Sequence, residues 1–330
     1  MAVESNIRCG PFDLLEPRGS GSVAVVWRAR HRTGGVAAAV KVITREKARR
    51  PKYRERFRRE VRSHARLNHP AVAAVFDYGE IDEAAEASSD GELVAGSPYL
   101  AMEYTEGGTL GDSDRINSWF TTRSILLQVL DGLAHAHARR VVHRDLKPDN
   151  ILWFPDRDGG RFKISDFGIA HAFSKLVGVA TQDIRDAIAG TPYYMPPEQL
   201  SGEWRSVGPW SDLYAVGCVA WELVCGSRPF AGGNLAEVAG QKFSGHIPEI
   251  EPRFPLPDEA VDWLERLLKK APSERFRRAA DAAWALRQLP ARAPVPSAEE
   301  PSGGRDPHAT GRRPDMETTD IVDFDDEETK

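Results

Sequence analysis

The sequence predicts an α+β fold in two lobes, with a small lobe rich in β-strands followed by a larger lobe that is mainly helical. Short β-type runs separated by glycine-containing turns occupy residues 12–43. In the second half, apolar residues repeat with a period of 3.6 instead, most clearly over 125–136. Near residue 290 the composition changes to proline, glycine and small polar residues, so the folded part covers about 12–289.

The small lobe is predicted to be a sheet with one helix. β-type runs at 23–27 and 36–43 are followed by a charged helix at about 54–67 and by a further strand region that ends at 99–104. Between that helix and the last strand lies an acidic run at 80–92, which we expect to be a solvated loop.

The large lobe is predicted to consist of helices around one hairpin. A periodic pattern at 261–268 and an apolar run at 214–225 predict helices in addition to the one over 125–136. The run at 214–225 carries Glu222 and is too short to span a bilayer, so it predicts a buried helix. The sequence Asp156-Arg157-Asp158-Gly159-Gly160 lies between two β-type runs and predicts a β-hairpin.

Composition excludes several classes of protein. Hydrophobic residues make up 41% and charged residues 28% of the 330, which excludes collagen-like and fully disordered chains. The net charge of −5 gives no basic excess for binding nucleic acid. No apolar stretch predicts a membrane span or a signal peptide, so we expect a cytoplasmic protein. The cysteines, Cys9, Cys218 and Cys225, form no CxxC pair and predict neither a disulfide framework nor a zinc site.

The segment after residue 289 differs in kind from the rest of the chain. It is rich in Pro and Gly at first, and eight of the last sixteen residues are acidic. Such a segment buries too little apolar surface to offset its ordering entropy, which predicts a disordered tail. The predicted organisation is therefore a lead of residues 1–11, a small lobe of 12–104, a large lobe of 105–289 and a tail of 290–330.

A glycine-rich turn joins the first two strands of the small lobe. In Gly19-Ser20-Gly21-Ser22 the missing Cβ atoms let backbone N–H groups approach phosphates, although such a turn is more often only a hairpin. Lys41 ends an apolar strand, and Glu60 on the following helix is placed to pair with its ammonium. A lysine held in this way grips a polyphosphate as a point charge. If these two residues stood alone, a surface lysine and a surface glutamate would be the simpler interpretation.

Two sequence strings in the large lobe carry the chemistry. The string His-Arg-Asp-Leu-Lys-Pro-Asp-Asn at 143–150 follows the long helix, and Asp166-Phe167-Gly168 follows a predicted strand. Asp145 is suited to accept the proton of an attacking hydroxyl, and Lys147 to offset charge on a transferred phosphoryl group. Asn150 and Asp166 supply the hard oxygens that Mg²⁺ prefers. The agreement of two such strings at this spacing is too specific to arise by chance.

With these residues in place, the sequence resembles the protein kinase family, in particular the eukaryotic-like (Hanks-type) serine/threonine kinases of bacteria. The resemblance covers about residues 12–289 and implies a bilobal kinase fold. It also implies transfer of the ATP γ-phosphoryl group to Ser or Thr hydroxyls of protein substrates, with autophosphorylation, in intracellular signalling. The implied cofactors are ATP and Mg²⁺, with Mn²⁺ as a substitute.

The resemblance implies a role for each motif residue. The glycine-rich turn covers the ATP phosphates, Met102 is the gatekeeper, and Glu103-Tyr104-Thr105 is the hinge that pairs with adenine. The implied catalytic residues are Asp145, Lys147, Lys41 and Glu60, and the implied metal ligands are Asn150 and Asp166. The implied contacts to ATP are Gly19, Ser20, Gly21, Ser22, Val26, Ala39, Lys41, Met102, Glu103, Thr105, Asn150, Leu152 and Asp166.

Further residues match the family's supporting positions. Glu198 closes the activation segment and is expected to pair with Arg275, while Asp212 is expected to brace the catalytic loop. The departures from the family pattern are small: Ala24 replaces the third loop glycine, Pro196 replaces an alanine, and Ala271 stands where an Asp is common. None removes a group that touches phosphate, metal or hydroxyl, so we expect an active enzyme.

Regulation is predicted at two groups of hydroxyls. Within the activation segment, Thr181 is the preferred phosphate acceptor and Ser174 a weaker one, because Arg144 is the type of arginine that pairs with a loop phosphate. Thr318 and Thr319 lie in the acidic tail, where a phosphothreonine is a ligand for forkhead-associated domains. The alternatives are an unmodified loop and an unmodified, solubilising tail.

Other partners follow from charge. Residues 45–66 hold eleven Lys or Arg against three acids, which predicts either a solvated helix face or a docking surface for an acidic partner such as the tail at 316–330. A second copy of the chain is a further candidate partner, and neither nucleic acid nor membrane is expected. Two other functions stay open, a nucleotide-binding pseudokinase scaffold and a small-molecule phosphotransferase.

Overall fold

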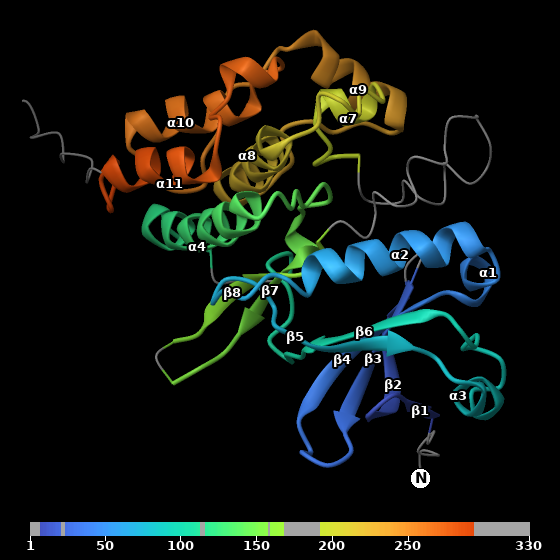
Figure 1. Ribbon diagram of the computed structural model, residues 1–330. Coiled ribbons are helices and arrows are strands. Elements are labelled where there is room, and N and C mark those ends of the chain that lie inside the picture. The colour runs from blue at the N-terminus through green and yellow to red at the C-terminus, as the bar shows by residue number, and fades with distance from the viewer. Residues whose placement is uncertain (1–6, 21–23, 113–115, 158, 168–191, 294–330) are drawn as a thin grey trace, which may run out of the picture. The chain divides into compact units, whose positions relative to one another are not determined.

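A computed structural model describes residues 7–20, 24–112, 116–157, 159–167 and 192–293 (Figure 1). Its strands and helices follow one another in the order that the sequence predicts, with a sheet and one long helix first and a group of helices afterwards. The predicted α+β class is therefore confirmed. In addition, the segment that we expected to precede the domain contributes the strand β1 (Ile7–Cys9), which pairs with the next strand.

The small lobe is a six-stranded antiparallel sheet with the strand order β1-β2-β3-β4-β6-β5. The strands at 24–31, 37–43 and 98–103 match the β-type runs predicted at 23–27, 36–43 and 99–104, and the strand at 12–20 leads into the glycine-rich turn. In the register between the third and fourth strands, Val26 lies opposite Lys41. The strands after β1 are β2 (Phe12–Ser20), β3 (Ala24–His31), β4 (Ala37–Ile43), β5 (Val75–Glu80) and β6 (Pro98–Glu103).

The sheet buries a different cluster on each face because successive side chains of a strand alternate. On β6, Tyr99 belongs to a cluster with Trp27, whereas the neighbouring Leu100 packs with Phe57 and Val61 of the long helix α2 (Pro51–His64). Figure 1 shows α2 running alongside the sheet. A short helix, α1 (Arg45–Ala48), comes just before it. The predicted helix at 54–67 is thus confirmed, three residues earlier at both ends.

The acidic run at 80–92 is not the solvated loop that we expected. It contains the helix α3 (Glu83–Ser88), whose N-terminus is capped by the Asp82 carboxylate accepting from Ala85 N at 2.7 Å. Ala85 and Leu93 are buried in the cluster that holds β1. The prediction was wrong because only single apolar residues, widely spaced among acids, anchor this insertion, and they form no periodic pattern.

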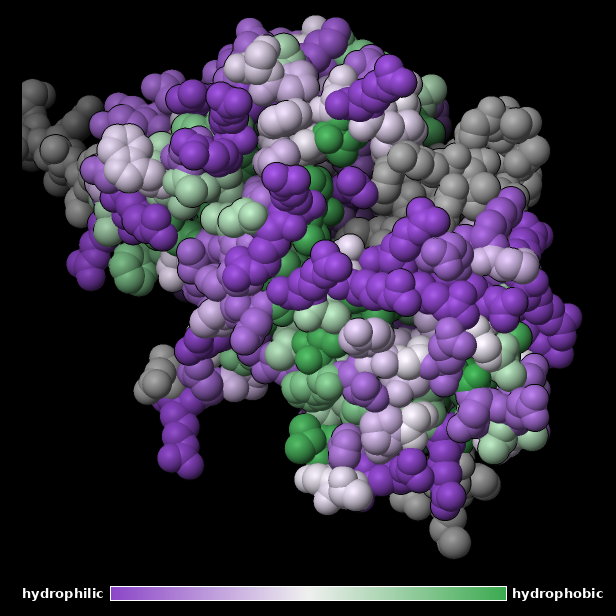
Figure 2. Space-filling view, in the orientation of Figure 1, coloured by the Kyte–Doolittle hydropathy of each residue, from purple (hydrophilic) through white to green (hydrophobic). Residues whose placement is uncertain are grey.

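Part of the basic stretch 45–66 holds this insertion in place. Arg58 forms an ion pair with Glu80 at 2.7 Å and donates to Gly96 O at 3.1 Å, and Arg54 donates to Ala95 O at 3.5 Å. Figure 2 shows hydrophilic side chains covering the exposed side of α2. Some of the basic residues therefore have partners within the fold.

The large lobe is built around a buried central helix, α8 (Pro209–Cys225). Nearly every side chain from Ser211 to Val224 is buried, which confirms the buried helix predicted at 214–225. Within the described residues, no helix is long and apolar enough to cross a membrane. Around α8 lie α4 (Trp119–Ala138), α7 (Pro197–Leu200), α9 (Leu235–Ser244), α10 (Asp258–Leu268) and α11 (Ala279–Gln288).

The predicted hairpin is present as β7 (Ile151–Phe154) and β8 (Arg161–Ile164), with a 3-10 turn, η1 (Pro148–Asn150), directly before it. Backbone hydrogen bonds from Ala73 N to Ile164 O and from Ile164 N to Ala71 O connect this hairpin to the small lobe. The last helix of the fold is α11. Just after it, Pro290 O accepts a hydrogen bond of 2.8 Å from the Trp119 side chain of α4. A second 3-10 turn, η2 (Pro272–Glu274), joins α10 to α11.

Candidate active site

The candidate site forms where three segments meet. Lys41 comes from β4, Asp145 and Asn150 come from the turn after α4, and Asp166 follows β8 directly. His143 connects the two large-lobe segments, because its Nε2 lies 2.8 Å from Ser165 O. The sequence strings that lie far apart in the chain are thus brought together.

Lys41 and Asp166 form an ion pair across two segments. Lys41 Nζ lies 2.8 Å from Asp166 Oδ1, and the side chains are 10% and 22% exposed. Burial by itself raises the pKa of the Asp166 carboxyl, but Lys41, with smaller help from His64 and His143, outweighs it and holds that pKa below the ordinary value. Asp166 is therefore an anion at neutral pH. The side chain of Glu60, the partner expected for Lys41, lies outside what the structure describes, so that pairing stays a prediction.

Asp145 is a largely buried carboxylate, 12% exposed, that the fold leaves incompletely bonded. Asn150 Nδ2 donates to Asp145 O at 2.7 Å and to its Oδ2 at 3.3 Å, and Lys147 Nζ lies 3.8 Å from Oδ2. Among the described residues Oδ1 has no hydrogen-bond partner. Burial raises the pKa of Asp145, and Lys147 offsets part of that effect. An oxygen of this kind is suited to accept a proton or hydrogen bond from an arriving group.

Asp212 of α8 holds the turn that carries Asp145. Its carboxylate accepts from the backbone N–H groups of His143 and Arg144, both at 2.8 Å. Its Oδ2 also lies 2.8 Å from His137 Nε2. Burial works to raise the Asp212 pKa, but these hydrogen bonds and the two histidines hold it below the ordinary value. The prediction that Asp212 braces this loop agrees with these contacts.

A row of three rings joins α2 to the site. Phe167 lies with its ring centroid 4.7 Å from that of His143 and 5.4 Å from that of His64. His64 is fully buried, and neither ring nitrogen makes a hydrogen bond of good geometry to the described residues. The backbone of Ala73 is near enough to act weakly on the ring. Burial lowers the pKa of His64 to about 4, so the ring is neutral at pH 7. Sequence reasoning missed His64, although its spacing from Phe57 and Val61 places it in the apolar stripe of α2.

The residues expected around adenine lie on neighbouring strands. Ala39 on β4 is opposite Met102 on β6, and Met102 is buried. Glu103 donates its N–H to Ala74 O, and its carboxylate binds Lys163 at 2.6 and 2.7 Å. Because the side chain and the N–H of Glu103 are engaged in this way, its backbone carbonyl is what it could offer a ligand.

The remaining predicted contacts are only partly described. Thr105 Oγ1 donates to Trp153 O at 2.6 Å, which anchors the segment after β6 against β7. Leu152 lies on β7 next to that point. Gly19 and Ser20 end β2, and Val26 lies on β3. Gly21, Ser22, Ser174, Thr181, Thr191, Thr318 and Thr319 lie outside the described residues.

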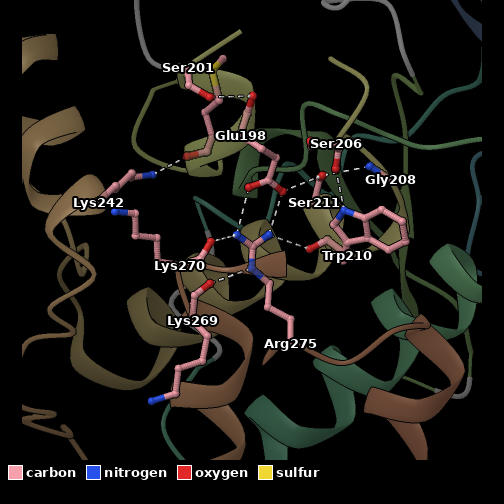
Figure 3. Close-up of polar contacts among 11 residues, drawn as sticks. Glu198, Ser201, Ser206, Gly208, Trp210, Ser211, Lys242, Lys269, Lys270 and Arg275 are labelled. Atoms are coloured by element: carbon pink, nitrogen blue, oxygen red, sulfur yellow. Dashed lines mark hydrogen bonds and ion pairs between the residues drawn. The ribbon is translucent and has the colours of Figure 1, made fainter. Parts of the chain in front are cut away.

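In the large lobe, Glu198 and Arg275 form the pair that the sequence predicts (Figure 3). Arg275 Nη1 and Nη2 donate to the two Glu198 oxygens at 2.8 and 3.0 Å, in the bidentate geometry typical of arginine and carboxylate. Both side chains are almost fully buried, at 0% and 3% exposure. The start of α7 is thereby fixed to the end of η2.

Comparison with known proteins gives a consistent result. The family model described as "Protein kinase domain" matches residues 12–285. The serine/threonine-protein kinase PknA of Mycobacterium tuberculosis is 37% identical over 308 residues, which are 91% of this chain and 66% of that protein. The probable serine/threonine-protein kinase PknB of Corynebacterium glutamicum is 35% identical over 84% of this chain and 42% of that protein.

Among solved structures, the crystal structure of Rad53 1-466 in complex with AMP-PNP matches with a TM-score of 0.63 at 28% identity. That match covers 83% of this chain and 64% of the other. This chain thus spans about two thirds or less of the length of these relatives. The sequence resemblance and the fold expected from it agree with all of these matches.

Proposed function

The chain belongs to the protein kinase family, and from this premise we propose that it transfers the γ-phosphoryl group of ATP to Ser and Thr hydroxyls of proteins. The observation that carries the proposal is the buried group formed by Asp145, Asn150, Lys41 and Asp166. It joins a carboxylate with a free oxygen to a paired lysine and an ionised aspartate. The naming of its bacterial relatives as serine/threonine kinases supports the same activity.

We propose that ATP is held by Lys41 at its α- and β-phosphates and by the backbone of the 103–105 segment at its adenine. Lys41 is suited to this because its ammonium is buried, fixed by Asp166 and aligned with Val26 of the strand that follows the glycine-rich turn. The match to a structure bound to AMP-PNP supports the choice of nucleotide. The predicted contacts from Gly19, Ser20, Gly21, Ser22, Ala39, Met102 and Leu152 belong to this proposal.

The same cluster is suited to a divalent cation. Asp166 is held in its ionised form, and Asn150 donates through Nδ2, which leaves its Oδ1 to serve as a hard oxygen ligand. We propose that these two residues hold Mg²⁺, with Mn²⁺ as a substitute. When bound, the ion supplies charge neutralisation for the phosphate oxygens.

In the proposed reaction, Asp145 Oδ1 accepts a hydrogen bond from the acceptor hydroxyl and then its proton. The hydroxyl oxygen forms a bond to the γ-phosphorus as the bond to the ADP oxygen breaks. Lys147, at 3.8 Å from Asp145, is placed to offset charge on the group in transfer. Asp212 keeps this turn in position. Nothing in the described site favours a pseudokinase scaffold, because Lys41, Asp145, Asn150 and Asp166 are all in place.

Regulation is proposed at the hydroxyls named from the sequence. Among the described residues, the buried Arg144 Nε has no hydrogen-bond partner, which supports phosphate binding from Thr181 or, more weakly, Ser174. Thr318 or Thr319 is proposed as a docking site for a forkhead-associated domain, and a second copy of the chain as a further partner. The proposed kinase domain is residues 12–289.

The test is phosphate incorporation with Mg²⁺-ATP, using wild type, Asp145→Asn and the matched control Asp149→Asn. Asp149 lies in the same turn but is exposed. We expect wild type and Asp149→Asn to phosphorylate themselves and a Ser/Thr peptide, and Asp145→Asn to be slower by about 10²–10⁴-fold. Mass spectrometry then locates the phosphates. Equal rates in wild type and Asp145→Asn, or phosphate on neither protein nor peptide in any of the three, would refute the proposed activity.

A further inference from the structure

Lys242 of α9 is a fully buried lysine, with 1% of its surface exposed. An ammonium without water is costly unless hydrogen bonds or an opposite charge compensate it. Within the described residues no carboxylate lies within ion-pair distance of Lys242 Nζ. The sequence around it gives no sign of this burial, because lysine on an amphipathic helix ordinarily faces water.

The compensation comes from the backbone of one short segment. Lys242 Nζ donates to Tyr193 O at 2.7 Å and to Met195 O at 2.8 Å. It also lies 5.2 and 5.4 Å from the ring centroids of Tyr214 and Phe230, where the negative ring faces attract a cation. Figure 3 shows Lys242 reaching from α9 toward the segment that leads to Glu198. Both hydrogen bonds of the ammonium are thus made to the backbone of residues 193–195.

Residues 192–196 cannot be held by regular secondary structure. The sequence Pro-Tyr-Tyr-Met-Pro-Pro at 192–197 has three prolines without N–H donors, so a regular ladder of hydrogen bonds is impossible. Side chains take over the role. Tyr194 Oη donates to Glu222 of α8, and the Arg228 guanidinium lies 4.2 Å from the Tyr193 ring centroid. Lys242 fixes the main chain, while these contacts fix the side chains.

The segment is also tied to the candidate site. Just after it, Gln199 Nε2 donates to Arg144 O at 3.1 Å, which places α7 against the turn that carries Asp145. Residues 193–195 come directly before α7 in the chain, so they are held close to the same turn. A protein that presents a hydroxyl to Asp145 therefore passes next to residues 193–195.

We infer that Lys242 is a positioning residue for the acceptor protein, which acts by fixing the backbone of residues 193–195 on which the acceptor chain rests. This inference deepens the proposed kinase function and depends on it. Without the ammonium, the carbonyls of Tyr193 and Met195 lose their hydrogen bonds, and the backbone on which the acceptor rests is no longer fixed. Acceptor binding should then weaken while nucleotide binding, which uses other segments, is unchanged.

The ionisation of Lys242 gives an independent readout. Burial lowers its pKa from the ordinary value to about 8, with the Arg275 guanidinium acting in the same direction and the Glu198 carboxylate opposing. The neighbouring Cys218 and Tyr214 on α8 have raised pKa values, so they stay neutral near pH 8. Below pH 8 the bonds to Tyr193 and Met195 are charge-assisted, and above it they weaken to those of a neutral amine. The acceptor KM should therefore rise as the pH passes through about 8.

The experiment compares wild type with Lys242→Met, Lys242→Gln and the control Lys269→Met. The side chain of Lys269 is half exposed and forms one ion pair, with Glu265, among the described residues. The measurements are KM and kcat for a Ser/Thr peptide, KM for ATP, binding of a fluorescent ADP, and hydrogen exchange of the amides at 193–195. We expect the peptide KM of Lys242→Met to rise about tenfold, with faster exchange at 193–195 and unchanged ATP KM. Lys242→Gln should lie between, and Lys269→Met should match wild type.

Each outcome decides one question. Without peptide phosphorylation by wild type, the proposed kinase function fails before Lys242 is tested. If wild type is active but Lys242→Met keeps its peptide KM, or loses ATP and peptide affinity together, Lys242 does not position the acceptor. Should Lys242→Met fail to fold, Lys242→Gln and the wild-type pH profile replace it, and a peptide KM that is flat from pH 7 to 9 would overturn the inference.

Discussion

Two buried charged clusters in this molecule are built in opposite ways. In the pair of Arg275 and Glu198, every donor of the guanidinium is used: Nη1 and Nη2 bind Glu198, and the remaining bonds go to the carbonyls of Trp210, Lys269 and Lys270. Glu198 Oε1 also accepts from Ser211 at 2.8 Å. No group in this cluster is left for a ligand.

The cluster around Asp145 is left open instead. Asp145 Oδ1 and Arg144 Nε are buried without a hydrogen-bond partner in the described part of the chain, and the nearby His64 is neutral and makes no well-formed hydrogen bond there. Buried polar atoms are rarely left in this state, because each costs free energy of folding. The difference teaches that the closed cluster serves the fold, whereas the open one retains unused bonding capacity, as the proposed binding of nucleotide, metal, acceptor and loop phosphate requires.

The largest expected effect tests the closed cluster. Arg275→Met leaves the Glu198 carboxylate buried without its cation, and we expect it to lower the free energy of unfolding by about 3–5 kcal/mol. Guanidinium denaturation followed by tryptophan fluorescence measures this change. Arg278→Met is the control, because Arg278 is exposed and pairs only with Asp281. A loss below about 1 kcal/mol would show that the cluster is not the anchor that its geometry indicates.

A smaller effect of opposite sign is expected at the ring row beside the open cluster. His64→Leu replaces a buried imidazole by an apolar side chain of similar size. The ring nitrogens have no well-formed hydrogen bond among the described residues and interact only weakly with the Ala73 backbone, so removing them should stabilise by more than the lost contacts with Ala73 and Phe167. We expect a net gain of about 1 kcal/mol. Thermal and chemical denaturation measure the gain. A clear loss of stability would mean that His64 makes a specific bond in solution.

The smallest effect on stability is expected at Asp145 itself. Burial raises its pKa, so ionisation at pH 7 is disfavoured by the fold, and an amide removes that cost while keeping an oxygen for Asn150. Asp145→Asn should therefore unfold within about 1 kcal/mol of wild type, although transfer is lost. Denaturation beside the activity assay checks this. Strong destabilisation would assign Asp145 to the fold, as in the closed cluster.

Much of the fold was predictable from periodicity. Apolar spacing predicted the helices that became α4, α8 and α10, and the β-type runs predicted most of the sheet, because these patterns repeat over many residues. The insertion after β5 was not predictable, since the apolar residues that anchor it, Ile81, Ala85 and Leu93, are few and are separated by polar residues. Single anchors leave no period to detect. The proposed roles of the site residues come from sequence motifs, and their side-chain chemistry stays a prediction where no contact is described.

The sequence by itself determined which residues we propose for the site. Asp145, Asn150 and Asp166 are recognisable because phosphoryl transfer requires these residue types at short, fixed spacings within one turn or one strand end. Only the tertiary structure showed that the His64 ring lies in the core without a well-formed hydrogen bond among the described residues. It also showed that the Lys242 ammonium donates to two backbone carbonyls. The physical reason is that burial and bonding depend on segments far apart in the chain, which local sequence does not report.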